Sequence, residues 1–173
     1  MELADPTADL ALEEAIRSSL VERADLHVAL GERLAARGRT EEARQQFEIA
    51  ANAPTFSAAT RNSKGMALLQ LVRVTGAETT WREVIRDHPD FGRAWLNLAS
   101  LSIQRKNWAE VEEFSRVAIE REPLSGAAWN NLAIGLEELG RRAEAEAAYR
   151  KASEVDPNHP RARQARSILD RLP

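Results

Sequence analysis

The sequence contains no cysteine, little histidine, few aromatic residues and no long apolar run. Without cysteine, the 173-residue chain forms no disulfide, no thiolate zinc site and no cysteine nucleophile. Its three histidines are widely spaced and leave little for a metal site. No stretch approaches the roughly 18 consecutive apolar residues of a membrane span, so we expect no membrane insertion. The N-terminus lacks the basic and apolar regions of a signal peptide. We expect a cytoplasmic location, unless the sequence is a piece of a longer chain.

The charge is nearly balanced but unevenly distributed. A net charge of −3 lacks the basic excess that is typical of nucleic-acid-binding domains, so we expect no nucleic-acid partner. The 21 arginines greatly outnumber the three lysines, but they are scattered, which favours GC-rich coding over a phosphate site. Residues 1–23 carry six acidic and two basic side chains, whereas residues 160–173 carry one acidic and four basic side chains. Opposite charges at the two ends make head-to-tail association between copies an alternative to keep open.

Motifs that would indicate catalysis are missing. The sequence has no HExxH, GxSxG, P-loop or GxGxxG pattern. His27 falls on an apolar helix position, where a packed core residue is more common than a metal ligand. The adjacent glutamates at 137–138 point about 100° apart on a helix and do not converge. We therefore expect no enzyme activity and no cofactor.

Glycine and proline are sparse, and several residues recur at one spacing. Pro89, Pro123 and Pro157 are each 34 residues apart, as are Trp95 and Trp129. A fixed period of about 34 residues is typical of helix–turn–helix repeats that stack into a solenoid.

The clearest repeat spans residues 126–159. Its first half places apolar residues at i, i+3, i+4 and i+7 from Trp129, which predicts an amphipathic helix. Gly140 is expected to end that helix, and Pro157 to stop the second one. The unit resembles the tetratricopeptide repeat (TPR), and the match rests on Trp129, Leu132, Ala133, Gly140, Ala145, Tyr149, Ala152 and Pro157.

The same pattern recurs at 34-residue intervals toward the N-terminus and gives three further units. We expect an N-terminal helix and four repeats followed by a C-terminal capping helix, with boundaries at 1–23, 24–57, 58–91, 92–125, 126–159 and 160–173. The 58–91 unit is the most divergent. Its nearest turn glycine, Gly76, comes late, so a longer first helix and a shorter second helix are expected there. The resemblance implies an all-α fold, a right-handed superhelical solenoid of helix–turn–helix repeats.

The resemblance also implies where a partner would bind. TPR solenoids bind extended peptides or partner helices in a concave groove lined by the first helix of each repeat. The helical period assigns to that groove Asn62, Met66, Arg93, Leu96, Asn97, Ser100, Gln104, Asn130, Asn131, Ile134 and Glu138. Among these, Asn97 and Asn131 are equivalent and are expected to be accessible amides, able to bond a peptide backbone.

The residues argue against one known TPR device, the carboxylate clamp for chaperone tails. Its positions hold a single cation, Arg93, in the first three repeats and none in the last three. We therefore expect a non-enzymatic scaffold or adaptor for a neutral or amphipathic protein or peptide partner. Two alternatives are a self-associating structural module and a regulatory or docking domain of a larger, enzyme-containing chain.

Overall fold

The computed structural model describes residues 10–11, 13–14, 23–55 and 57–157. Within these ranges the chain is an all-α helical repeat solenoid without strands. Its full-length helices are α2 (Ala24–Ala36), α3 (Thr40–Asn52), α4 (Ala58–Gln70), α5 (Val74–Asp87), α6 (Gly92–Gln104), α7 (Trp108–Arg121), α8 (Gly126–Glu138) and α9 (Arg142–Val155). The expected terminal helices, 1–23 and 160–173, lie outside the described residues, except that 10–11 and 13–14 are helical and Arg23 is not.

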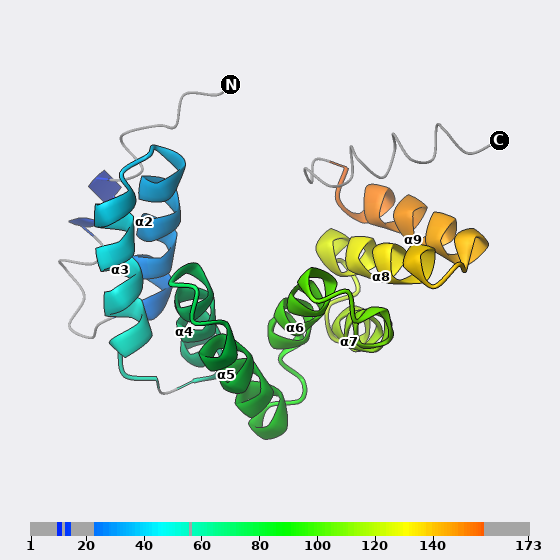
Figure 1. The fold of residues 1–173 in the computed structure, drawn as a ribbon, viewed down its shortest axis with the longest axis horizontal. Coiled ribbons are helices and arrows are strands. Elements are labelled where there is room, and N and C mark those ends of the chain that lie inside the picture. The colour runs from blue at the N-terminus through cyan, green and yellow to red at the C-terminus, as the bar shows by residue number, and fades with distance from the viewer. Residues whose placement is uncertain (1–9, 12, 15–22, 56, 158–173) are drawn as a thin grey trace. The chain divides into compact units, whose positions relative to one another are not determined.

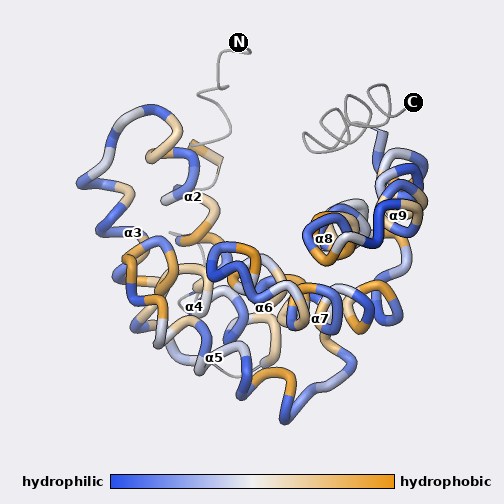
Figure 2. Tube along the Cα trace, turned by 45° about the vertical axis from the view of Figure 1, so that its right-hand side comes forward, coloured by the Kyte–Doolittle hydropathy of each residue, from blue (hydrophilic) through white to orange (hydrophobic). Residues whose placement is uncertain are grey.

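The helices form two compact units, Met1–Val84 and Ile85–Pro173, with the division inside α5. Figure 2 shows that every helix mixes apolar and polar residues, so each contributes one side to a core. In the first unit α2 and α3 form a hairpin, and α4 packs against both. The buried residues of this core include Leu30, Leu34 and Phe47.

Close helix contacts in the first unit depend on glycine. A methyl group on Gly31 of α2 would come within 2.6 Å of Phe47 Cε1 on α3. Gly65 of α4 stands 34 residues later, and a methyl group there would come within 2.7 Å of Trp81 Cε2 on α5. Trp81 is 1% exposed, and its indole N–H donates to the carbonyl of Asn62 over 3.3 Å. Each hairpin of this unit thus packs a large aromatic ring onto a bare stretch of backbone.

The second unit contains the same kind of helical hairpin, but alanine stands at the position where the first unit has Gly31 and Gly65. Figure 1 shows α8 and α9 side by side, and α7 and α6 both pack against α8. Tyr149 of α9 packs with Leu132, Ala133 and Leu136 of α8 in the core of this hairpin.

The period shared by tryptophan and proline has a structural cause. The indole N–H of Trp95 donates to the carbonyl of Pro89 at 3.0 Å, and Trp129 donates to Pro123 at the same distance. Each proline ends one repeat and each tryptophan opens the next, so the bond fixes the connection between them. Both tryptophans are half-buried. Trp129 is not fully buried, because its ring edge must reach this surface turn.

The turn between the two helices of each repeat has the same backbone form four times. Residues 38, 72, 106 and 140 all have positive φ, between 57° and 78°. The next residue then donates to a carbonyl five positions earlier, as Arg73 does to Leu68 at 2.8 Å, which is the Schellman pattern. The turn of the second repeat is therefore made by Val72. The expected late turn at Gly76 is wrong, and α4 and α5 have ordinary lengths of 13 and 14 residues.

Candidate functional site

The first helices of the two repeats in the second unit, α6 and α8, pack against each other. Their predicted partner-binding residues occupy equivalent sides of the two helices, one repeat apart. Arg93, Gln104 and Glu138 are exposed, whereas Leu96, Asn97, Ser100 and Ile134 are half-buried. We call these seven residues the α6–α8 face. The α6–α8 face combines apolar, amide and charged side chains.

Asn131 differs from the expectation of an accessible amide. It is 0% exposed, and its Nδ2 donates to Ser100 Oγ on α6 over 3.0 Å. The position lies where α8 packs against the first helix of the preceding repeat, so its amide joins the two helices. Asn97, one repeat earlier, is half-buried. The pair therefore does not form the two-rung row of accessible amides that the sequence predicted.

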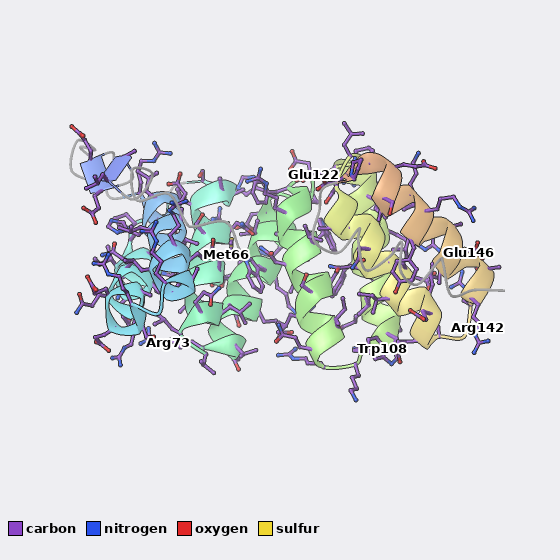
Figure 3. The ribbon with its side chains drawn as sticks, turned by 90° about the horizontal axis from the view of Figure 1, so that it is seen from above. Met66, Arg73, Trp108, Glu122, Arg142 and Glu146 are labelled. Carbon is purple, nitrogen blue, oxygen red and sulfur yellow. The ribbon has the colours of Figure 1, made fainter. Side chains whose placement is uncertain are left out.

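Two further asparagines of the predicted set are also buried. Asn130 of α8 is 3% exposed and Asn62 of α4 is 5% exposed. The amide nitrogen of Asn62 lies 3.8 Å from the sulfur of Met66, one turn later on the same helix. Met66 itself is half-buried; Figure 3 labels it on α4. Met66 is therefore the more exposed residue of this pair.

A polar network that the sequence did not predict lies next to the α6–α8 face. The hydroxyl of Tyr149 donates to Glu137 Oε2 over 2.8 Å, linking α9 to the C-terminal end of α8. Burial raises the pKa of Tyr149 above its usual value, and the Glu137 carboxylate raises it further. Tyr149 therefore stays a neutral donor at physiological pH.

Arginines join successive repeats in the second unit. Arg141, which precedes α9, contacts both carboxylate oxygens of Glu112 on α7 at 2.7 Å. It also bonds Glu144 in its own repeat, and Arg116 bonds Glu112 from within α7. Burial opposes the change, but Arg116 and Arg141 together lower the pKa of Glu112. Figure 3 labels Trp108 and Arg142, the first residues of α7 and α9, and Glu122, which follows the end of α7.

No group of three or more histidines, acids or cysteines within the described residues could hold a metal ion. None of the helices in these ranges is long and apolar enough to cross a membrane. His27 is buried, and its Nδ1 lies 2.8 Å from Gln46 Oε1.

Solved structures with the same fold include two that are described as TPR proteins. MamA from Desulfovibrio magneticus RS-1 is 18% identical over 88% of this chain and 86% of its own, with a TM-score of 0.61. YrrB, described as a TPR protein with an unusual peptide-binding site, is 18% identical over 93% and 82%, with a TM-score of 0.59. The TPR domain of Arabidopsis OM64 is 20% identical over 66% and 94%, with a TM-score of 0.60. No curated protein matches the chain in sequence.

Sequence profiles of the family agree with these neighbours. Tetratricopeptide repeat profiles match residues 62–114 and residues 126–159, which together make up about half of the chain. The TPR fold supports a protein-interaction scaffold, and TPR proteins are generally non-enzymatic. On the evidence of its 34-residue period, its paired helices and both profile matches, the chain belongs to the tetratricopeptide repeat family.

Proposed function

We propose that the protein is a non-enzymatic adaptor that binds a peptide segment of a protein partner on the α6–α8 face. One observation carries the proposal. The hydrogen bond from Asn131 to Ser100 fixes α8 against α6, and Leu96, Asn97 and Ile134 stand partly open beside this bond. A preformed surface with apolar anchors and polar edges binds a peptide with little cost of ordering. The peptide-binding description of YrrB, which has the same fold, supports this use.

The charges on the face restrict the partner. Arg93 lies near the start of α6 and Glu138 at the end of α8, and both are exposed. A single cation and a single anion favour an amphipathic segment over a strongly charged tail. The scarcity of cations agrees with the absence of a carboxylate clamp.

The experiment selects peptides from a displayed random library against the whole chain and maps the selected peptides by amide NMR shifts. We expect shifts concentrated at Leu96, Asn97, Ser100 and Ile134. Leu96→Glu should weaken binding on the order of tenfold or more, because a charge would replace an apolar anchor. Glu113→Ala on the exposed surface of α7 serves as the control and should leave affinity unchanged. Peptides that shift residues elsewhere, or that bind Leu96→Glu equally well, contradict the proposal.

Self-association remains the alternative. It would use the oppositely charged ends of the chain, which carry net charges of −4 over residues 1–23 and +3 over residues 160–173. Sedimentation at low and high salt separates the two functions. A monomer at every salt concentration removes the alternative, whereas assembly that weakens with salt favours it.

A further inference from the structure

One ion pair in the first repeat is reversed with respect to the others. In the other three repeats the second helix carries a glutamate that pairs with an arginine four residues later: Glu78–Arg82, Glu112–Arg116 and Glu146–Arg150. In α3 the equivalent positions hold Arg44 and Glu48, in the opposite order. Glu48 accepts instead from both terminal nitrogens of Arg73, at 3.0 and 2.6 Å. Arg44 is exposed and has no carboxylate partner in the described part of the chain.

A strained residue lies close to Arg44. Val72 has φ of 61°, and the residue is 81% exposed. A β-branched residue is a genuine outlier in this left-handed region. Glycine occupies the equivalent position in the first and fourth repeats, as Gly38 and Gly140. With most of its surface open, Val72 gains little packing within the chain to offset the strain.

These features meet at one hollow in the first unit. The hollow has a volume of about 410 Å³ and lies between α3 and the turn that joins α4 to α5. Its apolar lining comes from Ala43, Phe47, Leu71 and Val72, while Arg44 and the Arg73–Glu48 pair supply its charges. Figure 3 labels Arg73 at this turn. The volume falls within the range of about 300–1,000 Å³ that is usual for ligand pockets. We call this hollow the Val72 pocket.

We propose that the Val72 pocket is a second docking site, which takes a protein segment that presents an apolar side chain next to an aspartate or glutamate. The apolar side chain fills the space beside Phe47 and covers the methyl groups of Val72. The neighbouring carboxylate accepts from the guanidinium of Arg44. Glu48 is held by Arg73 and does not compete for Arg44. Strained residues concentrate at ligand-binding sites, and contact with a partner is what would offset the strain at Val72.

The direct experiment titrates the whole ¹⁵N-labelled chain with a capped probe peptide, acetyl-Ser-Asp-Leu-Phe-Ser-amide, up to millimolar concentration. We expect saturable amide shifts at Ala43, Phe47, Leu71 and Val72. The matched peptide with Asn in place of Asp should bind about tenfold more weakly, because it cannot form the charge-assisted bond with Arg44. A third peptide carries a free C-terminal carboxylate after Leu-Phe and no acidic side chain. The proposal is overturned if no shift saturates, if the Asn peptide binds equally well, or if the free C-terminus alone is recognised.

Two substitutions with matched controls separate docking from folding. Val72→Gly should raise the unfolding midpoint and yet weaken binding of the Asp peptide on the order of tenfold, since it removes the covered methyl groups. Lys106→Gly relieves the same backbone strain in the third repeat, and it should leave binding unchanged. Arg44→Gln should weaken binding of the Asp peptide but not of the Asn peptide. Arg142→Gln, at an exposed arginine of α9, should leave binding of both peptides unchanged. Unchanged binding by Val72→Gly, in a variant that is more stable, rejects the docking site.

Discussion

At the scale of the residue, the four intra-repeat turns place different side chains in one backbone conformation. Val72 and Lys106 have φ of 61° and 57°, values close to those of Gly38 and Gly140. The left-handed conformation destabilises a residue with a side chain by about 1–2 kcal/mol. Glycine avoids this strain but loses about 0.5–1 kcal/mol on folding, because its unfolded chain has more conformational freedom. We therefore expect Val72→Gly to stabilise the protein by roughly 0.5–1 kcal/mol, measured by urea unfolding.

The same turns supply the control for that prediction. Gly140→Ala places a side chain in the left-handed conformation, and no atom lies near enough to provide a compensating contact. It should lower the free energy of unfolding by roughly 1 kcal/mol. A destabilised Val72→Gly variant would show that the valine side chain contributes more to folding than its exposure indicates.

Ser115 supplies a second test at this scale. It is 0% exposed, and its hydroxyl has no hydrogen-bond partner within the described residues. A buried polar group left unpaired costs about 1–3 kcal/mol, so Ser115→Ala should raise the free energy of unfolding by about 1 kcal/mol. Ser102 is the matched control, because it is buried too but donates to Glu110 Oε2 over 2.8 Å. Ser102→Ala should be destabilising, and a loss of stability in both variants would mean that Ser115 has a partner in solution.

At the scale of the element, the pairing of helices could be predicted from the sequence. Among the residues that recur every 34 positions are those that pack the two helices of each repeat together. The recurrence of Trp129 after Trp95 follows from the bond each makes to a preceding proline carbonyl. The turn at Val72 could not be predicted, since intrinsic preference places glycine there and the neighbouring Gly76 suggested another boundary. The burial of Asn131 was missed because the period of one helix does not reveal which side the preceding repeat covers.

The reversed pair in α3 is visible in the sequence itself. Comparison at 34-residue spacing places Arg44 opposite Glu78, Glu112 and Glu146 of the later repeats. What the sequence could not provide is the position of Arg73, which bonds Glu48, so that Arg44 has no carboxylate partner among the described residues. Contacts between repeats depend on how neighbouring helices stack. A periodic sequence pattern predicts the position of each helix better than it predicts this stacking.

The contact between α7 and the start of α9 gives a pH-dependent prediction. Arg116 and Arg141 lower the pKa of Glu112, so this carboxylate stabilises the fold above its unfolded pKa. That contribution is lost as the pH falls through the lowered folded pKa. Glu112→Gln should therefore be less stable than the parent at pH 7, by up to about 1 kcal/mol, and the difference should shrink in acid. Urea unfolding at pH 7 and pH 3 checks this, and a difference that persists unchanged at pH 3 assigns it to packing.

At the scale of the whole molecule, the helices contact near neighbours in sequence. Within the first unit α2 contacts α3 and α4, and within the second α8 contacts α6, α7 and α9. Stability in such an array is approximately a sum of local terms, so damage to one unit should remain local. Trp81→Ala removes a ring that is 1% exposed in the first unit and should cost roughly 3–5 kcal/mol.

Hydrogen exchange measures how far that damage extends. We expect amides of α4 and α5 to exchange much faster in Trp81→Ala, while α8 and α9 keep the rates of the parent. Trp129→Ala is the reciprocal variant. Its side chain is half-buried, so it should cause a smaller loss that is confined to α8 and its neighbours. Equal acceleration of all helices by either variant would show that the array unfolds as one cooperative block. Partner binding at one unit would then stabilise the other, which the local arrangement of contacts does not predict.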